Sequence, residues 1–251
     1  MRIITWNLNA RVRSAPAQVA ALAALCPDVI ALQEVTPGSW AVLRPALVAA
    51  GFEALICSLD SHPRPGLLPR VAALAAREPL LPCSPAPLVP APEVCLAATL
   101  DDIAVVSLHV PTRVSAYGGQ SLKLGTQEGT LAWLDSVALP VVVAGDLNAP
   151  KAETGPGDVL AFSSRRDLRS HAAELGFHTH PVLIDAFRAC HGYDRQDISW
   201  AWKNRGRTGG YRLDHILASP ALRPTHCEYD HEHRLSGLSD HSPMVADFAL
   251  A

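Results

Sequence analysis

The stretch "VVVAGDLNAP", residues 141–150, runs an apolar segment into Gly145, Asp146 and Asn148. Four small apolar residues, three of them β-branched, are typical of a buried strand. The polar residues that follow have two interpretations. They form an Asx turn that closes the strand, or they form one wall of a site that holds metal and phosphate. For a single strand end the turn is the simpler interpretation, so the choice depends on the rest of the chain.

The same pattern recurs elsewhere in the chain, where a carboxylate, an amide or an imidazole ends or follows an apolar run: Asn7, Glu34, His109, Asp214 (inside a predicted strand), and Asp240 with His241. Buried carboxylates are costly unless they are paired, hydrogen-bonded or bound to metal. Strand ends at one edge of a sheet are where site residues commonly gather. Together these positions favour one shared site. Glu34 and Asn7 offer hard oxygen ligands suited to Mg²⁺ or Mn²⁺.

Composition excludes several classes of protein. The 251 residues are 49% hydrophobic and 18% charged, which excludes a largely disordered chain. The net charge of −3 and the pI near 6.4 show no global basic field for nucleic acid, although a local basic surface or a bound cation would still attract a polyanion. No run of about 18 apolar residues suggests a membrane span.

The six cysteines include no C-x-x-C pair, which argues against a zinc ribbon and against a disulfide framework. The N-terminus "MRIITWNLNA" reads as a strand rather than a signal peptide. We therefore expect buried thiols in a cytoplasmic protein.

Strands and helices are intermixed along the chain. We expect strands over 2–7, 28–35, 53–57, 71–77, 94–100, 102–110, 141–146, 198–202, 211–218 and 243–249, and helices over 16–25, 39–51, 120–138 and 164–176. Several strands are adjacent in sequence, which predicts mixed sheets covered by helices rather than a strictly alternating parallel fold. The proline-rich segment 79–92 suits a packed connection better than a linker. We therefore expect a two-sheet α/β sandwich forming one domain, 1–251.

Six motifs, taken in order, resemble the endonuclease/exonuclease/phosphatase superfamily with its DNase I-like fold: "TWNLN", "LQEV", "SLHVPT", "GDLNAP", "YRLDHIL" and "SDHSP". The C-terminal third resembles the exodeoxyribonuclease III and AP endonuclease branch, in which a "D-x-FR" segment, a Trp-bearing strand and "G-[WY]-R-L-D" recur in this order. The resemblance implies a four-layer α/β sandwich of two mixed β-sheets flanked by helices. It also implies hydrolysis of a phosphodiester with Mg²⁺ or Mn²⁺.

The resemblance assigns the metal and the attacking water to one group of residues. Glu34 would be the main metal ligand, supported by Asn7 directly or through water. Asp240 would lie near a second metal position or a water in its shell. Asp146 would orient or deprotonate the attacking water, and Asn148 would donate to the scissile phosphate or place that water.

A second group would contact the phosphate and the sugar. His241 would contact a non-bridging oxygen, with Asp214 orienting its ring, as in a hydrolase triad. His109 can also donate to phosphate. Trp200 and Tyr211 occupy positions where the family places aromatic walls around the sugar, although a core Trp is an equal alternative.

The match departs from the DNA-repair branch at "HVPT", residues 109–112, where those members carry Tyr and then "PNG" or "PNA". Thr112 lacks the amide that Asn would bring. This departure argues against cleavage at abasic sites more than against phosphoester hydrolysis. Five basic residues are candidate phosphate contacts, although a solvated face is the ordinary explanation for each: Arg113, Lys123, Lys151, Arg205 and Arg207. The pairs "HTH" (178–180) and "HEH" (231–233) have metal-site spacing but are ordinarily solvated.

Three functions remain open at this point. The first is a metal-dependent DNA nuclease, either a 3′→5′ exonuclease or an AP endonuclease. The second is a phosphatase or phosphodiesterase for a small molecule, a lipid headgroup or a nucleotide. The third is an inactive binding module, which the complete set of competent residues disfavours. DNA is the expected partner, with no membrane and no obligate protein partner, and the oligomeric state stays open.

Overall fold

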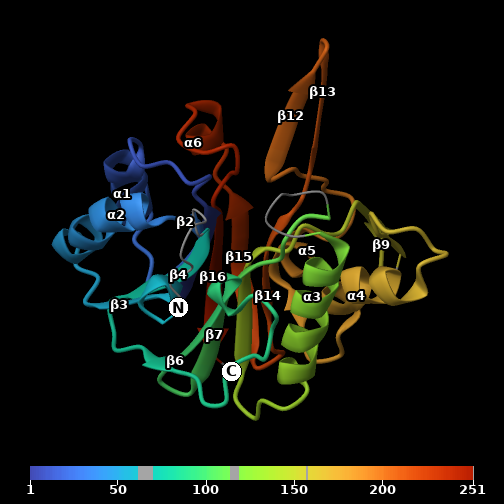
Figure 1. Ribbon diagram of the computed structural model, residues 1–251, viewed down its shortest axis with the longest axis horizontal. Coiled ribbons are helices and arrows are strands. Elements are labelled where there is room, and N and C mark those ends of the chain that lie inside the picture. The colour runs from blue at the N-terminus through green and yellow to red at the C-terminus, as the bar shows by residue number, and fades with distance from the viewer. Residues whose placement is uncertain (62–69, 114–118, 157, 251) are drawn as a thin grey trace.

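The computed structural model describes residues 1–61, 70–113, 119–156 and 158–250. Two six-stranded mixed sheets pack face to face (Figure 1). The first sheet has the strand order β15 (Leu222–Tyr229), β16 (Met244–Leu250), β1 (Arg2–Asn7), β2 (Val29–Val35), β4 (Val71–Ala76) and β3 (Ala54–Cys57). The second has the order β11 (Ile184–Asp185), β14 (Asp214–Ala218), β8 (Val141–Asp146), β7 (Ile103–His109), β6 (Cys95–Leu100) and β5 (Leu81–Pro82).

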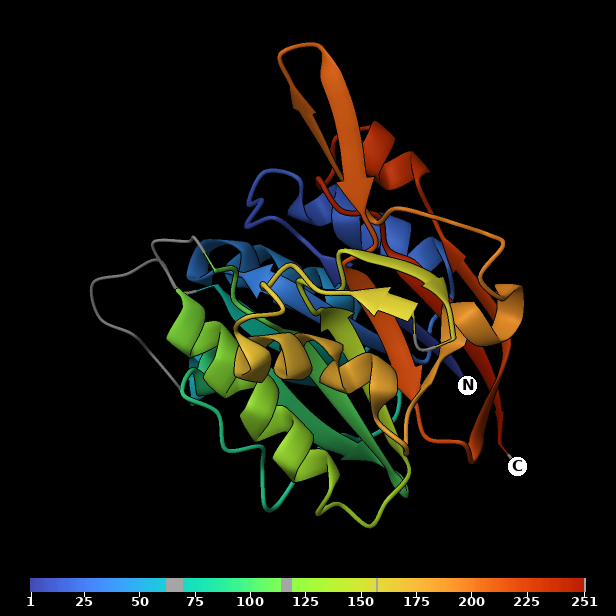
Figure 2. The same ribbon diagram turned by 90° about the vertical axis from the view of Figure 1, so that its right-hand side faces the viewer.

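Helices form the two outer layers. Helices α1 (Ala15–Ala24) and α2 (Pro37–Ala49) cover the first sheet, and α3 (Gln120–Leu134) and α4 (Leu168–Thr179) cover the second (Figures 1 and 2). The remaining elements are short: the turns η1 (Ser58–Asp60) and η2 (Pro92–Val94), the helices α5 (Ala186–His191) and α6 (Glu232–Leu235), and the hairpins β9 (Ala152–Gly155) with β10 (Asp158–Leu160) and β12 (Trp200–Asn204) with β13 (Arg207–Tyr211). This four-layer sandwich confirms the predicted fold class. Within the described ranges, no helix combines the length and the apolar character needed to cross a membrane.

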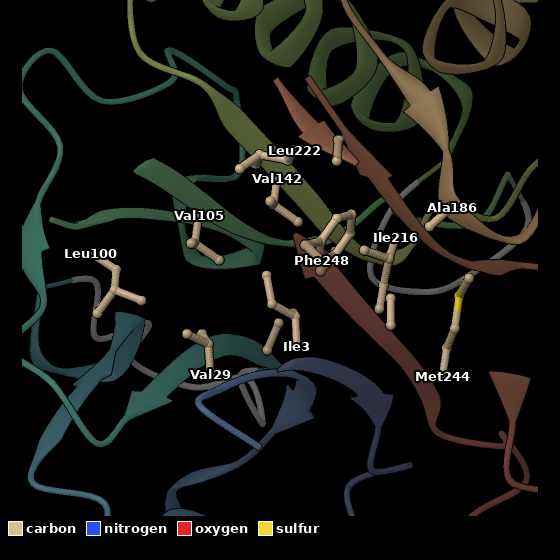
Figure 3. Close-up of a cluster of buried hydrophobic side chains, with 14 of the residues drawn as sticks. Ile3, Val29, Leu100, Val105, Val142, Ala186, Ile216, Leu222, Met244 and Phe248 are labelled. Carbon is tan, nitrogen blue, oxygen red and sulfur yellow. The ribbon is translucent and has the colours of Figure 1, made fainter. Parts of the chain in front are cut away.

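The alternation of side chains along each strand explains why the strands are almost continuously apolar. In β1, Ile3 points into the cluster between the two sheets, whereas Ile4 packs under α1 and α2. In β8, Val142 joins the inter-sheet cluster and Val143 packs toward α3 and α4 (Figure 3). Successive residues of a strand face opposite sides. A sheet that is buried on both faces therefore needs apolar residues at odd and even positions of each strand alike.

The strand directions bring the predicted site residues to one edge. Strand β1 runs parallel to β2, and β7 runs parallel to β8, so that the carboxyl ends of each pair lie together. These ends carry Asn7 and Glu34 in the first sheet, and His109 opposite Asp146 in the second. Asp214 begins the antiparallel strand β14 directly opposite Asp146.

Helix α4 differs from its prediction for a packing reason. It begins at Leu168 rather than at residue 164 and continues past Gly176 to Thr179. A Cβ at Gly176 would lie 2.5 Å from Cδ1 of Leu131 in α3. The glycine therefore allows the two helices to approach closely and does not end α4. Helix α3 in turn ends at Leu134, before the predicted residue 138, and the proline-rich segment packs beside it through a hydrogen bond from Trp133 Nε1 to the Pro85 carbonyl.

The C-terminal strands are also distributed differently from the prediction. Strand β15 was not predicted, because it contains Pro224 and buries only part of one face. It lies at the edge of its sheet, with an irregular register next to Pro224, which is where a strand tolerates proline. The expected strand 211–218 divides at residues 212–213 between β13 and β14, and the expected strand 198–202 begins at Trp200.

Gly145 generates a prediction about stability. A Cβ at this position would lie 1.8 Å from the carbonyl oxygen of Leu108 in the parallel strand β7. We expect Gly145→Ala to lower the free energy of unfolding by about 3 kcal/mol or more, because backbone must move to relieve the overlap. Urea denaturation measures this change. The matched control is Gly155→Ala, whose new Cβ would lie 3.8 Å from its nearest neighbour and should change stability by less than about 1 kcal/mol. Equal stability of the two variants would contradict the prediction.

Candidate active site

A pocket of about 650 Å³ opens at the edge where these strands end. Ten of the twelve residues predicted for the site line it: Glu34, His109, Thr112, Arg113, Asp146, Asn148, Trp200, Tyr211, Asp240 and His241. The other two, Asn7 and Asp214, are buried and hydrogen-bond to Asp146 and His241 respectively. The structure thus brings all twelve into one place.

The carboxylate of Asp146 lies at the floor of the pocket and is 2% exposed. Its Oδ2 accepts a hydrogen bond from Asn7 Nδ2 at 3.0 Å, and its Oδ1 accepts one from the backbone N–H of Asn148 at 3.0 Å. Burial raises the pKa of Asp146, and the nearby Asp214 carboxylate raises it further, while the imidazoles of His241 and His109 oppose the shift. A carboxylate with a raised pKa is a stronger base than an exposed one.

His241 and Asp214 form a buried pair beside Asp146. Nδ1 of His241 hydrogen-bonds to Oδ2 of Asp214 at 2.7 Å. Nε2 of His241 lies 3.8 Å from Oδ2 of Asp146. Burial alone would lower the pKa of His241, but the charge and hydrogen bond of Asp214, with Asp146 and Asp240 nearby, raise it to about 10. The imidazole is therefore cationic at neutral pH, with Nε2–H directed toward Asp146 and the pocket.

Glu34 is presented by an irregular part of β2. The register between β2 and β4 shifts between Leu32 and Val35, and Glu34 has a φ of +54°. Such bulges redirect a side chain at a functional edge. Oε2 of Glu34 accepts from Arg70 Nη1 at 2.6 Å, and Oε1 lies 3.9 Å from Nε2 of His109.

The donor set suits a hard divalent cation. Asn7, Glu34 and Asp240 supply carboxylate and amide oxygens, the ligand type that Mg²⁺ and Mn²⁺ prefer. In the structure the guanidinium of Arg70 forms an ion pair with the carboxylate of Glu34. Asp146, Asp214 and His241 also offer ligand atoms within 4.8 Å of one another, although Nδ1 of His241 and Oδ2 of Asp214 are already engaged with each other.

Asn148 satisfies both interpretations of the opening stretch. Its φ of +46° lies in the left-handed region, which Asn tolerates better than most residues. Its backbone N–H closes an Asx turn onto Asp146, and its Nδ2 donates to the carbonyl of Val110 at 2.8 Å. The turn exists, and it holds the carboxylate of the site.

Aromatic rings form one wall of the pocket. Trp200 and Tyr211 face each other across the hairpin with ring centroids 6.3 Å apart, and Trp200 Nε1 donates to Asp240 Oδ2 at 3.1 Å. Trp200 therefore lines the pocket rather than the core. Phe162 packs edge-on against Tyr211 at 4.9 Å. Neither Phe162 nor Arg70 was predicted, because each lies outside the recognised motifs and carries no local signal.

The histidine pairs lie outside this pocket. His178 is buried against His215, with Nδ1 lying 3.9 Å from Asp185 Oδ2, and burial lowers its pKa to about 3. The three side chains have metal-site spacing, but Arg212 already supplies the cation for Asp185. His178 is therefore not a solvated residue, contrary to its prediction. In the second pair, His231 Nε2 faces Asp197 Oδ1 at 2.9 Å, and His233 packs against a Trp ring.

The buried pair generates a prediction about pH. In NMR titration the His241 ring should remain protonated until pH approaches 10, and Asp214→Asn should lower its pKa to the usual value of about 6.5 or below. Because the folded pKa is raised, the stabilisation is fully present below pH of about 6.5 and is lost as pH rises through about 10. The control is Asp197→Asn, which removes the carboxylate that faces Nε2 of His231 and should leave the pKa of His241 unchanged. A His241 ring that titrates alike in wild type and Asp214→Asn would contradict the assignment.

Comparison with known proteins places this geometry in a family. Residues 4–241 match the model of the endonuclease/exonuclease/phosphatase family. A comparison with curated proteins finds no match. Three solved structures illustrate the shared fold. An AP endonuclease from Archaeoglobus fulgidus superposes with a TM-score of 0.76 at 22% identity over 100% of both chains.

The other two structures are more varied. The 3′ phosphatase NExo from Neisseria, bound to a product DNA hairpin, has a TM-score of 0.71 at 22% identity over 99% of both chains. TDP2 from Caenorhabditis elegans has a TM-score of 0.66 at 13% identity, covering 100% of this chain and 74% of its own. At these identities the structures show a common DNase I-like fold. Because the family model matches residues 4–241, which is nearly the whole chain, the chain belongs to the endonuclease/exonuclease/phosphatase family and is a phosphoester hydrolase.

Proposed function

We propose that this hydrolase is a divalent-metal-dependent phosphodiesterase that acts on DNA, as a 3′→5′ exonuclease or at abasic sites. One observation carries the proposal. A basic carboxylate, Asp146, and a cationic imidazole, His241, lie 3.8 Å apart at the floor of a pocket walled by Trp200 and Tyr211. That arrangement provides a base, a positive donor for a phosphate oxygen, and an aromatic surface for a sugar or base.

Asp146 would take the proton of the attacking water. Its raised pKa favours proton transfer, and the hydrogen bonds from Asn7 and Asn148 leave it oriented toward the pocket. His241 would donate from Nε2 to a non-bridging phosphate oxygen, where negative charge develops in the transition state. Asp214 would hold the ring and stabilise its charge through Nδ1. His109, 3.8 Å from Asp146, would supply a second donor to the phosphate.

Glu34, Asn7 and Asp240 would hold the divalent ion. When bound, such an ion would offset the charge of the phosphate and of the leaving oxygen. Glu34 is directed into the pocket by its bulge, and Asp240 is oriented by Trp200. No covalent intermediate is needed, since the residues present suffice for direct attack by water.

A basic hairpin supports a polyanionic substrate. Strands β12 and β13 project beyond the body of the molecule beside the pocket (Figures 1 and 2). The hairpin exposes Lys203, Arg205 and Arg207. These cations would contact phosphates away from the scissile bond, whereas the net charge of the whole chain is −3. Arg113, exposed at the mouth of the pocket, would add a further contact. Thr112, on the same rim, would contact the substrate through its hydroxyl.

A second candidate is a phosphatase or phosphodiesterase for a small molecule, lipid headgroup or nucleotide. It is favoured by His109 and Thr112, which stand where the DNA-repair members carry Tyr and an amide. A substrate panel separates the two functions: abasic duplex, 3′-recessed duplex, single-stranded DNA, RNA and a phosphomonoester, each with Mg²⁺, Mn²⁺ or EDTA. Cleavage of DNA diesters supports the nuclease, and activity on phosphomonoesters alone would overturn it.

Two variants test the assigned chemistry on the substrate that the panel identifies. We expect Asp146→Asn and His241→Ala each to lower kcat by about 10³-fold or more, because each removes a group that acts in the transition state. Circular dichroism checks the fold. His226→Ala is the control, since His226 is exposed on the edge strand β15, outside the pocket, and its loss should leave kcat unchanged. A near-native rate for either site variant would refute the role of that residue.

Metal dependence provides a further prediction. EDTA should abolish cleavage, and Mg²⁺ should restore it. Glu34→Gln should raise the Mg²⁺ concentration that gives half-maximal rate by at least about tenfold, because a neutral amide binds a hard cation more weakly than a carboxylate. The matched control is Glu128→Gln, a carboxylate on α3 that pairs with Arg169 away from the pocket. Undiminished cleavage in EDTA would exclude the metal-dependent mechanism.

A further inference from the structure

One buried charge beside the site has no part in the mechanism above. Lys123 in α3 is 2% exposed, although the sequence analysis favoured a solvated face for it over a phosphate contact. Its Nζ donates to the backbone carbonyl of Asn148 at 2.9 Å and lies 3.0 Å from Oε1 of Glu174 in α4. It also lies 5.7 Å from the centre of the Phe162 ring. A buried ammonium persists only when its donors are satisfied, and here its neighbours are a carbonyl, a carboxylate and an aromatic face.

Glu174 extends the network to the aromatic wall. It is 1% exposed, and its Oε2 accepts from the backbone N–H groups of Phe162 at 2.6 Å and Ser163 at 3.0 Å. Phe162 in turn packs against Tyr211. The ion pair therefore joins the turn after β8 to the loop that carries Phe162, through two helices that lie side by side (Figure 2).

Three contacts hold the Asn148 turn. Its φ of +46° lies in the left-handed region, which Asn tolerates better than most residues, and the surroundings of the residue keep it there. The N–H of Asn148 holds Asp146 Oδ1, and its side chain holds the Val110 carbonyl. The remaining backbone group, its carbonyl, is held by Lys123. Rotation of this turn would withdraw the donor that orients the base.

We propose that Lys123 is a positioning residue of the site: its ammonium holds the Asn148 carbonyl and thereby fixes the turn that orients Asp146. The proposal rests on the function proposed above, for which Asp146 is the base. Lys123 lines the pocket, but we assign it no contact with the substrate, because its Nζ is already engaged by the Asn148 carbonyl and by Glu174. Glu174 has a separate part, which is to hold the Phe162 loop.

Three variants separate the two parts. Lys123→Met removes the donor and keeps the length of the side chain, but it leaves Glu174 buried without its cation. The double variant Lys123→Met/Glu174→Gln removes both charges, and the amide oxygen introduced at position 174 can still accept from the Phe162 loop. The control is Arg169→Met, which breaks the exposed Arg169–Glu128 pair between the same two helices.

With the wild type active on the DNA substrate, we expect both Lys123 variants to lower kcat by on the order of 10²-fold while KM changes less than about threefold. Arg169→Met should retain the wild-type kcat. A purely structural role would lower the melting temperature and leave kcat per folded molecule unchanged. That result, or a wild-type kcat in the folded double variant, would overturn the proposal.

A second measurement does not depend on activity. In ¹H–¹⁵N spectra, the backbone amides of Asp146, Leu147 and Asn148 should shift in the double variant and not in Arg169→Met. If the wild type cleaves none of the DNA substrates, the proposed function fails, whereas these resonances still show whether Lys123 holds the turn. Unshifted amides in the double variant would overturn the positioning role even if its rate falls.

Discussion

The burial of one carboxylate organises the whole site. Asp146 is 2% exposed, and a charge in that environment requires hydrogen bonds and opposite charges on several sides. Its partners come from both sheets: Asn7 from the first, and Asn148 and His109 from the second and the turn that follows it. The imidazole of His241 completes the set from the loop before β16. The site therefore exists only when the two sheets are packed together, which links its chemistry directly to the fold.

This constraint also explains how one environment supports two kinds of group. Burial and the neighbouring Asp214 raise the pKa of Asp146, which makes it a better base. The same Asp214, hydrogen-bonded to Nδ1, raises the pKa of His241 to about 10 and keeps it cationic. A base and a positively charged donor thus stand 3.8 Å apart. Burial is the largest cause of the raised pKa of Asp146, and Asp214 acts on both groups, because it repels the negative one and stabilises the positive one.

Local patterns predicted most of the fold and the twelve residues that meet in the site. Strands that are buried on both faces are apolar at nearly every position, so β1, β2, β7 and β8 could be predicted without tertiary information. The failures occurred where the tertiary setting of a residue gives its local signal a different meaning. Gly176 permits the approach of α4 to α3, although a glycine near the end of a helical pattern indicates a terminus. Pro224 lies in an edge strand, where its lost hydrogen bond is harmless, although proline in a run argues against a strand.

The sequence by itself determined the sandwich of two sheets, the edge at which polar residues gather, and the resemblance that assigns "GDLNAP" to a hydrolytic site. It did so because strand periodicity and short motifs are local properties. The tertiary structure alone decided which groups surround Asp146, that Arg70 neighbours Glu34, that Phe162 joins the aromatic wall, and that Lys123 is buried under the Asn148 turn. Those facts depend on contacts between residues far apart in the chain, and no local pattern records the distance between two side chains until both sheets and their helices have packed.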